Sequence, residues 1–427
     1  MKRLFIVLML GACFDVGAAR NAEQIAAVAA GTEPRAVASW WGFDAEDSTE
    51  YLQAAIDSGA AEVVVPYVGK PWVVRPIKLR SDLELVFEPG VVVLAKKGEF
   101  KGKGDSLFSV SDAKNIAIRG YGATLRMRKA DYQSDAYEKA EWRMTLALRG
   151  CTNVTVEGVR LESSGGDGIY VGCTGNQPWC ENVVIRDVVC RDHHRQGISV
   201  IGAVNLLIEN CEMSGTDGTA PQAGIDLEPN NPGERLENCV VRNCIFESNT
   251  GPGILLYLKP LLRQTKPVSI LFEDCHVRSG RSTGISVGAV KDDGPEGTIL
   301  FKNCTVENTQ EPGAYVYDKS AESASVTFEN CKWNNVAQEE DQTPIRLNAR
   351  RESVAKTIGG INFDDCRLYD SKERPAVVIE GKEGMKARDV HGRIETPEDK
   401  AAPIDSKIDA DNITLEVSAG PGGAGSG

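Results

Sequence analysis

The sequence has few aromatic residues, only four histidines and no long apolar run beyond its N-terminus. A membrane-spanning helix needs about 20 consecutive apolar residues, so no transmembrane segment is expected. The formal net charge is −13, which argues against a nucleic-acid partner because phosphate binding needs clustered Lys and Arg. His and Cys show no metal-ligand spacing, so no metal site is predicted and no cofactor is evident. Binding of Ca²⁺ by surface carboxylates stays open.

The N-terminus has the pattern of an export signal. Lys2 and Arg3 precede a short apolar run, too short to span a bilayer. Two interpretations stay open: a signal peptide over residues 1–19, cut after small residues, or a lipoprotein signal over residues 1–12. The second follows from the letters LGAC, which resemble a bacterial lipobox and would make Cys13 a lipid anchor. The protein is therefore predicted to be secreted, periplasmic or lipid-anchored at the bacterial cell surface.

The central part of the sequence repeats. Eight segments follow one another about every 30 residues, each with two short stretches in which apolar and polar residues alternate, as in β-strands. The column between the two stretches reads Gly158, Asp187, Asn210, Asn243, Asp274, Asn303, Asn330 and Asp365. Because Asn and Asp tolerate left-handed backbone at turns, we expect this column to form a ladder of side-chain hydrogen bonds.

A third short strand follows each repeat, directly after a glycine or proline. Three strands per coil predict an all-β fold, a single-stranded right-handed parallel β-helix with about 30 residues per coil. We place this domain at residues 40–396. It includes an N-terminal capping helix at 48–58, with Asp47 or Ser48 as the N-cap. Residues 397–427 are predicted to form a C-terminal extension with a flexible tail.

The cysteines fall into two groups. Six occupy one inward column of the repeat and are expected to be buried free thiols that act as small apolar side chains: Cys211, Cys244, Cys275, Cys304, Cys331 and Cys366. Cys173 and Cys180 instead flank the loop TGNQPW. An exported protein favours disulfides, so a Cys173–Cys180 bond closing this loop is predicted.

Several segments resemble a known superfamily. The stretch FDAEDSTEYLQAAID, the VVVP that follows it and the repeats are similar to pectin-lyase-like right-handed β-helices. That resemblance implies the fold, and it leaves the reaction open among glycosidases, lyases, epimerases, tailspikes and adhesins. GGDGIYV, with Asp167, and HRQGISVIG, from His194, resemble two motifs of polygalacturonase-type glycosidases. The paired aspartates of that family are absent, and Gln196 stands where it has a histidine.

Polar residues gather on the outer face of the third strands. We expect Tyr170, Ser199, Asp226 and Tyr257 to point to solvent from neighbouring coils. Glu228 shares a face with Asp226, about 6.5–7 Å along the strand. Inverting glycosidases separate two carboxyls by about 6.5–9.5 Å, and different surroundings can split such a pair into acid and base.

These columns give the candidate site residues. The catalytic candidates are Asp226 and Glu228, assisted by Asp167 or His194. The substrate-binding candidates are Tyr170, His193, Arg195, Gln196, Tyr257, Lys259, Tyr315 and Tyr317. A four-residue insertion at 215–220 is expected to form a wall beside Asp226. Each charged residue could also be an ordinary solvated side chain.

Three functions remain open from the sequence. The first is a glycoside hydrolase that cleaves a polysaccharide or oligosaccharide in a groove along the third strands. The second is a polysaccharide lyase or C5-epimerase on uronic acids, in which His194 or Tyr257 removes a proton and Arg195 or Lys259 neutralises the substrate carboxylate. The third is a carbohydrate-binding or surface protein without catalysis. The oligomeric state is not predicted.

Overall fold

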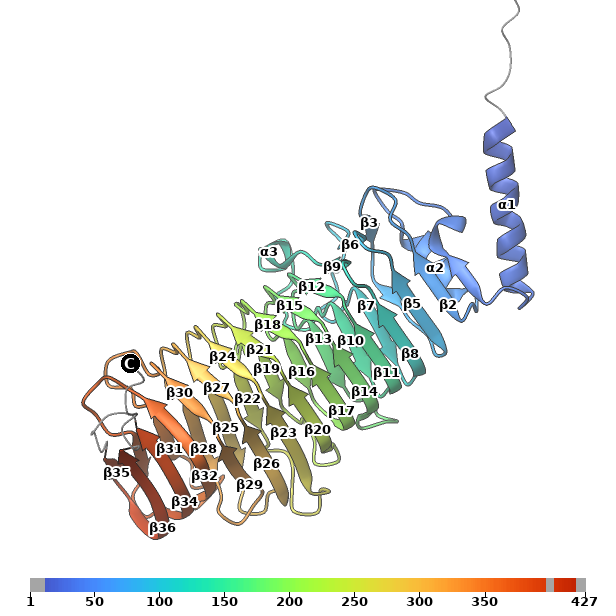
Figure 1. Cartoon of the computed structure of the whole chain (residues 1–427). Helices are drawn as coiled ribbons and strands as arrows, with labels where there is room; N and C mark the ends of the chain where they lie inside the picture. The colour runs from blue at the N-terminus through green and yellow to red at the C-terminus, as the bar shows by residue number, and fades with distance from the viewer. Residues whose placement is uncertain (1–11, 397–402, 420–427) are drawn as a thin grey trace, which may run out of the picture.

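The computed structural model describes residues 12–396 and 403–419. Parallel strands wind into one elongated solenoid, with the helix α1 (Ala12–Ala29) at its N-terminal end (Figure 1). In the described residues, one 24-stranded sheet contains the first and second strands of the coils. A 12-stranded sheet contains the third strands. The paired strands of both sheets run parallel in the described residues, for example with Ile198 beside Ile225.

The strands fall into three rows. The first row is β1 (Arg35–Val37), β2 (Glu62–Val65), β5 (Leu83–Phe87), β8 (Lys114–Arg119), β11 (Thr152–Glu157), β14 (Cys180–Arg186), β17 (Ala203–Glu209), β20 (Leu236–Arg242), β23 (Val268–Glu273), β26 (Gly297–Lys302), β29 (Ser325–Glu329), β32 (Thr357–Tyr369), β34 (Lys386–Thr396) and β36 (Asp409–Ala419). The second row is β3 (Trp72–Val74), β6 (Val92–Ala95), β9 (Thr124–Arg126), β12 (Arg160–Glu162), β15 (Val189–Arg191), β18 (Glu212–Ser214), β21 (Ile245–Glu247), β24 (His276–Arg278), β27 (Thr305–Glu307) and β30 (Lys332–Asn334). The third row is β4 (Ile77–Lys78), β7 (Phe108–Ser111), β10 (Leu146–Arg149), β13 (Ile169–Gly172), β16 (Ile198–Val200), β19 (Ile225–Leu227), β22 (Ile254–Tyr257), β25 (Ile285–Val290), β28 (Ala314–Lys319), β31 (Ile345–Ala349), β33 (Val377–Gly381) and β35 (Ile404–Ser406).

The predicted ladder between the first and second strands is confirmed. Asn243 donates its amide to Asn210 at 2.7 Å, and Asn210 donates to Asp187 at 3.2 Å. All three residues have φ near +50°, a left-handed conformation that Asn and Asp adopt more readily than other side chains. The ladder therefore satisfies the polar groups of the turns and fixes one coil on the next.

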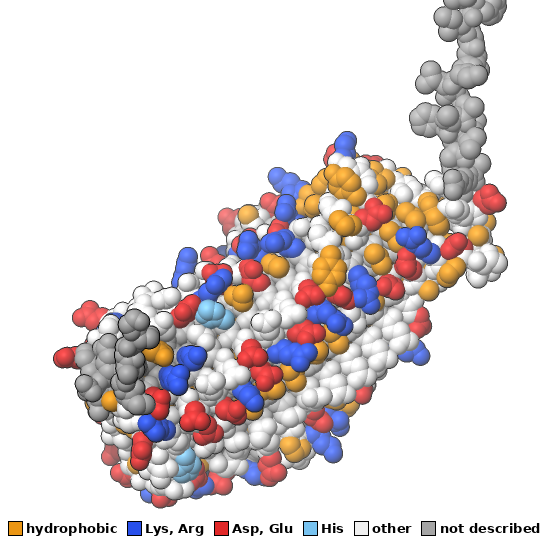
Figure 2. All heavy atoms as spheres, in the orientation of Figure 1, with side chains coloured by type: hydrophobic (Ala, Val, Ile, Leu, Met, Phe, Trp, Pro, Cys, Tyr) orange, Lys and Arg blue, Asp and Glu red, His pale blue; other side chains and the backbone are white. Residues whose placement is uncertain are grey.

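The core is a stack of inward side chains, as the repeat predicts. The six cysteines of the inward column are buried free thiols. A second stack is aromatic: the rings of Phe301 and Phe328 lie 5.0 Å apart, and Phe328 lies 5.2 Å from Phe363. The outer faces instead show rows of charged side chains along the solenoid (Figure 2).

The predicted Cys173–Cys180 disulfide is wrong in this structure, where both residues are free thiols. Cys180 begins β14 and points into the core, where the backbone N–H of Cys151 lies 3.3 Å from its sulfur. Cys173 lies outside the core and its thiol donates to the carbonyl of Pro178 at 3.0 Å. The two sulfurs therefore belong to different environments, although the loop between them is short.

The capping helix is confirmed as α2 (Thr49–Asp57), and its residues Leu52, Ala55 and Ile56 are buried against the first coils. The carboxylate of Asp47 accepts the backbone N–H of Thr49 at 3.1 Å. Asp47 also binds Lys96 at 2.8 Å, and these partners hold the pKa of Asp47 at about 2 even though burial opposes the shift. These contacts join the start of α2 to Lys96, the residue that directly follows β6.

The coils extend beyond the predicted limits of 40–396. β1 already pairs with β2 from Arg35, and β35 and β36 add strands after residue 396, with β36 pairing along β34. Residues 403–419 of the predicted C-terminal extension thus form part of a further coil. The sequence did not predict this coil because apolar and polar residues alternate only weakly there. The predicted tail at 420–427 lies outside the described residues.

Cys13 and the predicted cleavage point after Ala19 both fall within α1 (Ala12–Ala29). Among the helices that the structure describes, none is long and apolar enough to cross a membrane.

Candidate functional site

A groove lies on the edge of the solenoid where second strands turn into third strands. Four turns stack along this edge: the long turns 127–145 and 215–224, and between them the short turns 163–168 and 192–197. The turn 127–145 carries the short helix α3 (Lys129–Tyr132), which stands out from the coils in Figure 1. The groove has a volume of about 630 Å³ and is lined by Lys103, Tyr132, Gln133, Lys139, Ala140, Glu141, Trp142, His194, Gly218 and Thr219.

His194 lines this groove and contacts both of its long turns. Its Nδ1 lies 2.9 Å from the amide of Gln133 and its Nε2 lies 2.9 Å from the hydroxyl of Thr219. One partner comes from each long turn, so the imidazole bridges the two walls. Partial burial and the nearby ammonium of Lys129 lower its pKa, which leaves the ring neutral at pH 7. The insertion at 215–220 therefore does form a wall, but it packs against His194.

Asp226 faces outward from the third strand, yet it is buried. It lies between the core residues Ile225 and Leu227 on β19, so its side chain points away from the core. It pairs in register with Ser199 on β16, and both residues are only 1% exposed. The expectation that these two side chains reach solvent is therefore wrong, because neighbouring polar side chains cover them.

Asp226 and Glu228 lie two residues apart, within and directly after β19. Gln196 donates its amide to Oδ2 of Asp226 at 2.8 Å, while Oδ1 of Asp226 has no hydrogen-bond partner among the described residues. Burial raises the pKa of Asp226 well above its ordinary value, the charge of the nearby Glu228 raises it further, and the charge of Arg195 opposes the shift. The surroundings of Asp226 therefore favour its protonated form.

A single arginine connects this acid pair to the groove. Arg195 donates from Nη2 to Glu228 at 3.2 Å, and its Nε lies 3.6 Å from the carboxylate of Glu141. Its side chain is 15% exposed, whereas those of Glu141 and Glu228 are 27% and 31% exposed. The guanidinium therefore lies beneath two carboxylates that open towards solvent, one of which lines the groove.

Asp167 lies deeper in the same cluster. One of its oxygens accepts the backbone N–H of Gln196 at 3.1 Å, and the residue is 0% exposed. Burial raises its pKa to about 6, although the charge of Arg195 and the hydroxyl of Ser199 oppose the shift. Gln196 thus contacts two carboxyls, Asp167 through its backbone and Asp226 through its side chain. Asp167 is a protonatable group within the coils and does not line the groove.

Two of the predicted substrate-binding residues have no exposed surface. Gln196 and His193 are both 0% exposed. His193 bonds Ser164 at 2.8 Å through Nδ1, and burial lowers its pKa to about 3. Both residues therefore make contacts inside the protein. Gln196 orients the carboxyls of Asp167 and Asp226, and His193 joins neighbouring turns.

The remaining predicted residues are spread along the third strands. Tyr170 packs against Arg149, with the guanidinium 5.1 Å from its ring, and Tyr257 ends β22, next to Asp226's strand. Tyr315 and Tyr317 pack together on β28 with ring centroids 5.0 Å apart. That strand lies three coils beyond β19, or about 14 Å away at strand spacing. These tyrosines therefore lie outside the groove. Lys259 is exposed just after β22.

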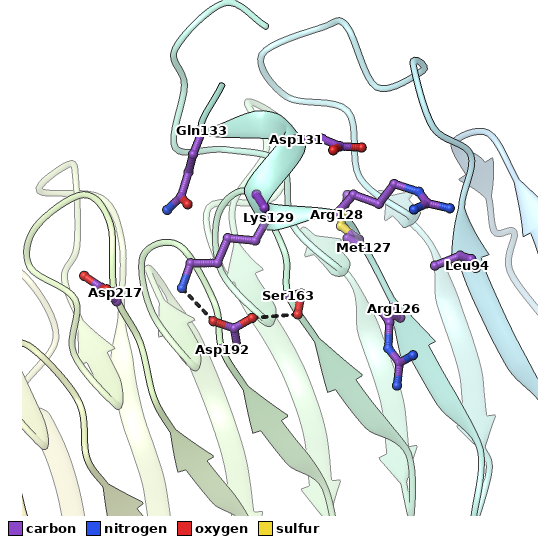
Figure 3. Close-up of a pocket in the computed structure, with 11 residues that line it drawn as sticks. Leu94, Arg126, Met127, Arg128, Lys129, Asp131, Gln133, Ser163, Asp192 and Asp217 are labelled. Carbon is purple, nitrogen blue, oxygen red and sulfur yellow. Dashed lines mark hydrogen bonds and ion pairs between the residues drawn. The ribbon is translucent and has the colours of Figure 1, made fainter. Parts of the chain in front are cut away.

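A second hollow lies beside α3 (Figure 3). It has a volume of about 620 Å³ and shares Gln133 with the groove. Within it, Lys129 donates to Asp192 at 2.8 Å, and the other oxygen of Asp192 accepts the hydroxyl of Ser163 at 2.7 Å. This chain of contacts joins α3 to the coils beneath it, so the turn 127–145 has a fixed position. Across residues 12–396 and 403–419, no three His, Cys, Asp or Glu side chains cluster in a way that could hold a metal ion.

Sequence reasoning missed the residues that the turn 127–145 contributes. Glu141 and Trp142 line the groove, together with Lys139 and with Lys103 from the preceding coil. The available signal was the interruption of the repeat itself, since a charged and aromatic insertion in a solenoid is a usual place for a binding loop. The repeat gives no register for such a segment, so its contacts could not be assigned.

The family model described as "Right handed beta helix region" matches residues 142–288. The chain has the fold of a right-handed parallel β-helix. The matched span covers the short turns of the groove and the cluster around Asp226, while most of the turn 127–145 precedes it.

A curated relative has no assigned activity. The uncharacterised protein YclG of Bacillus subtilis is 31% identical over 187 residues, which is 41% of this chain and 32% of YclG. The chain thus spans about a third of the length of the curated relatives it matches.

Solved structures share the fold across different activities. The exopolygalacturonase of Yersinia enterocolitica is 14% identical, with a TM-score of 0.53 over 91% of this chain and 78% of its own. The surface adhesin PfbA of Streptococcus pneumoniae is also 14% identical, with a TM-score of 0.54 over 90% of this chain and 93% of its own. At this identity the likeness shows the fold alone, which an enzyme and an adhesin share.

Proposed function

We propose that the protein is a carbohydrate-active enzyme, a glycoside hydrolase that binds a polysaccharide across the groove between turns 127–145 and 215–224. The observation that carries this proposal is the acid pair. Asp226 is 1% exposed, and burial raises its pKa well above the ordinary value, while Glu228, two residues further on, is 31% exposed. A carboxyl kept protonated by its surroundings is the general acid that glycoside hydrolysis requires.

The neighbouring side chains suit the same task. Gln196 fixes the orientation of Asp226, and Arg195 lies next to Glu228, where it can stabilise the anion left after proton donation. Trp142, whose side chain is partly exposed, offers a flat apolar face in the groove, and sugar rings pack on such faces. In this proposal Asp226 and Glu228 are the acid groups that supply the proton to the leaving oxygen.

A panel of polysaccharides tests this proposal through the reducing ends released by the purified chain. The wild type should release them from at least one polymer. Asp226→Asn should lower the rate by roughly 10²–10⁴ because Asn has no acidic proton to supply. Asn is close to Asp in shape, so the melting temperature should not fall. Full activity of Asp226→Asn would reject the assignment, and an inactive wild type would favour a binding protein.

A polysaccharide lyase or C5-epimerase on uronic acids is the second candidate. The lowered pKa of His194 leaves a neutral imidazole in the groove, where it could accept a ring proton. Lys103 and Lys139 line the same groove and could neutralise a uronate carboxylate. A lyase would produce an unsaturated uronate with new ultraviolet absorbance, and an epimerase would change the sugar without cutting the chain. Either product would replace the hydrolase assignment.

We also infer that the protein acts outside the cytoplasm, on the basis of the basic and apolar N-terminus. Cell fractionation should place the full chain in the medium, the periplasm or the membrane fraction. Labelling with a fatty acid that disappears in Cys13→Ser would identify the lipoprotein interpretation, and labelling of neither form would identify ordinary cleavage.

A further inference from the structure

The first strands carry an apolar stripe on their outer face. One outward position is paired in register through six consecutive coils, and its side chains are partly exposed. After a threonine in the first of these coils, the position is apolar in the other five: Thr155, Val184, Leu207, Val240, Leu271 and Leu300. At strand spacing the stripe is about 24 Å long. Contiguous exposed apolar surface, in contrast to single exposed apolar residues, is typical of an interaction site.

A shallow hollow lies at the middle of the stripe, bordered by asparagines. It has a volume of about 400 Å³, and Val184, Leu207 and Val240 are among the residues that line it. The asparagines bond one another from coil to coil, as where Asn238 donates its amide to Asn205 at 3.0 Å. The face therefore has an apolar centre and a polar border, the arrangement that protein interfaces share.

Charged side chains border the stripe on its other side and alternate in sign. In the same six coils they read Glu157, Arg186, Glu209, Arg242, Glu273 and Lys302. Figure 2 shows the orange row of the stripe beside a row of blue and red side chains. Ion pairs within the chain, such as Arg242 with Glu209 at 2.6 Å, explain the alternation, but they do not explain the apolar stripe beside it. The three anions and three cations cancel, although the whole chain has a net charge of −13.

This pattern is complementary to itself under one two-fold axis. The axis runs along the strands, between the coils of Leu207 and Val240, so it reverses the order of the coils and keeps each row opposite itself. Every charge then faces an opposite charge on the second copy: Glu157 faces Lys302, Arg186 faces Glu273, and Glu209 faces Arg242. A two-fold axis along the solenoid would instead place the charged row opposite the neutral asparagines, and the ion pairs would be lost.

We propose that two copies of this chain pack face to face and antiparallel through the first strands, as a homodimer. The two hollows meet at the axis, and the apolar side chains that line them leave water. The alternating charges select the antiparallel arrangement. The groove between turns 127–145 and 215–224 lies where second strands turn into third strands. The dimer therefore leaves both grooves open and does not depend on what they bind.

Sedimentation of the purified full chain over a series of concentrations tests the surface. The wild type should dimerise reversibly. Leu207→Asp should raise the dissociation constant at least about tenfold, because it places two carboxylates in the apolar centre of the interface. Ile245→Asp is the matched control, since Ile245 is a partly exposed outward residue of β21 in the second row. This variant should dimerise as the wild type does.

Charge reversal tests the orientation. Glu157→Lys and Lys302→Glu should each weaken the dimer about tenfold or more, because each places like charges opposite one another. The variant with both substitutions restores opposite charges across the axis and should recover the affinity of the wild type. The two positions lie five coils apart in one chain, or about 24 Å. A recovery therefore cannot come from a contact within one copy.

The outcomes decide the proposal whatever activity the protein has. A wild type that remains monomeric at every concentration up to its solubility limit overturns it. A dimer that Leu207→Asp leaves intact, or that Ile245→Asp weakens equally, places the interface elsewhere and also overturns it. If the double charge variant does not regain affinity, the antiparallel arrangement is wrong. Melting temperatures check that each variant is folded, and if Leu207→Asp does not fold, the charge-reversal series decides alone.

Discussion

At the scale of single residues, burial sets the chemistry of the acids. Asp167 and Asp226 belong to outward positions of the coils, where a carboxylate would ordinarily be solvated. Both are covered by neighbouring polar side chains, and both have raised pKa values. A buried carboxylate without a full set of hydrogen bonds disfavours its charged form, so these residues hold protons that an exposed Asp would have lost.

Asp167→Asn should stabilise the protein at neutral pH. The pKa of Asp167 is raised from 3.8 to about 6 in the fold. Its contribution to stability is therefore fully present below pH 3.8, and it is lost as the pH rises through about 6. The loss amounts to about 3 kcal/mol at most. Since Asn does not ionise, the melting temperature of the variant should exceed that of the wild type at pH 8 by more than it does at pH 3.5. A difference that is the same at both values would contradict the raised pKa.

The sequence predicts the orientation of Asp226 but not its burial. The alternation of Ile225, Asp226 and Leu227 correctly placed Asp226 on the outer face, because period-2 alternation is a local property. Its burial, and its hydrogen bond with Gln196, depend on rotamers and on which side chains of the adjacent coil cover it. Neither can be derived from spacing along one strand.

At the scale of elements, the turn 127–145 forms one wall of the groove through long-range contacts. Arg143 is fully buried and donates to the backbone carbonyls of Phe100 at 2.9 Å and Glu138 at 3.0 Å. Its guanidinium also lies 5.6 Å from the rings of both Tyr132 and Tyr137. One side chain thus joins the turn to itself and to the turn of the preceding coil.

Arg143→Leu should loosen this turn while leaving the coils folded. The change removes the donors to buried carbonyls, each of which costs about 1–3 kcal/mol when left unsatisfied. Limited proteolysis with mass spectrometry should therefore show new cleavage within 127–142. Activity on the polymer should fall as well. Arg126→Leu is the control, since Arg126 is a half-exposed partner of Glu162 outside the groove. Equal protease sensitivity in the two variants would contradict the anchoring role of Arg143.

The repeating elements were predictable and this turn was not, for a physical reason. Asn210 and Asn243 recur at equivalent positions, so their ladder can be read by aligning the repeats with each other. Arg143, in contrast, lies in a segment that has no counterpart in other coils. Nothing in its sequence neighbourhood indicates that it contacts Phe100. The short loop between Cys173 and Cys180 likewise suggests a disulfide from the sequence alone. In the structure the side chain of Cys180 points into the core, so the two thiols do not pair.

At the scale of the whole molecule, stability comes from the continuous core and from coil-to-coil pairing. Each strand row runs through the solenoid, and the interior columns stack apolar side chains, cysteines and phenylalanines along its length. The cysteines from Cys151 to Cys366 are all free thiols. The fold therefore does not depend on covalent links between its coils.

A reducing agent should leave the melting temperature unchanged. Dithiothreitol breaks disulfides, and the loss of a native disulfide typically costs about 2–5 kcal/mol. Thermal unfolding with and without the reagent, followed by circular dichroism, should give coinciding curves. A fall of several degrees in the reduced sample would show that a bond such as Cys173–Cys180 forms in the exported protein.

The central claim is that the protein cleaves a polysaccharide with Asp226 and Glu228 as its acid groups. The most direct test compares the reducing ends released by the wild type and by Glu228→Gln from the same polymer. The account predicts steady release by the wild type and nearly none by the variant, with both chains melting at the same temperature. Equal release by the two proteins would contradict it.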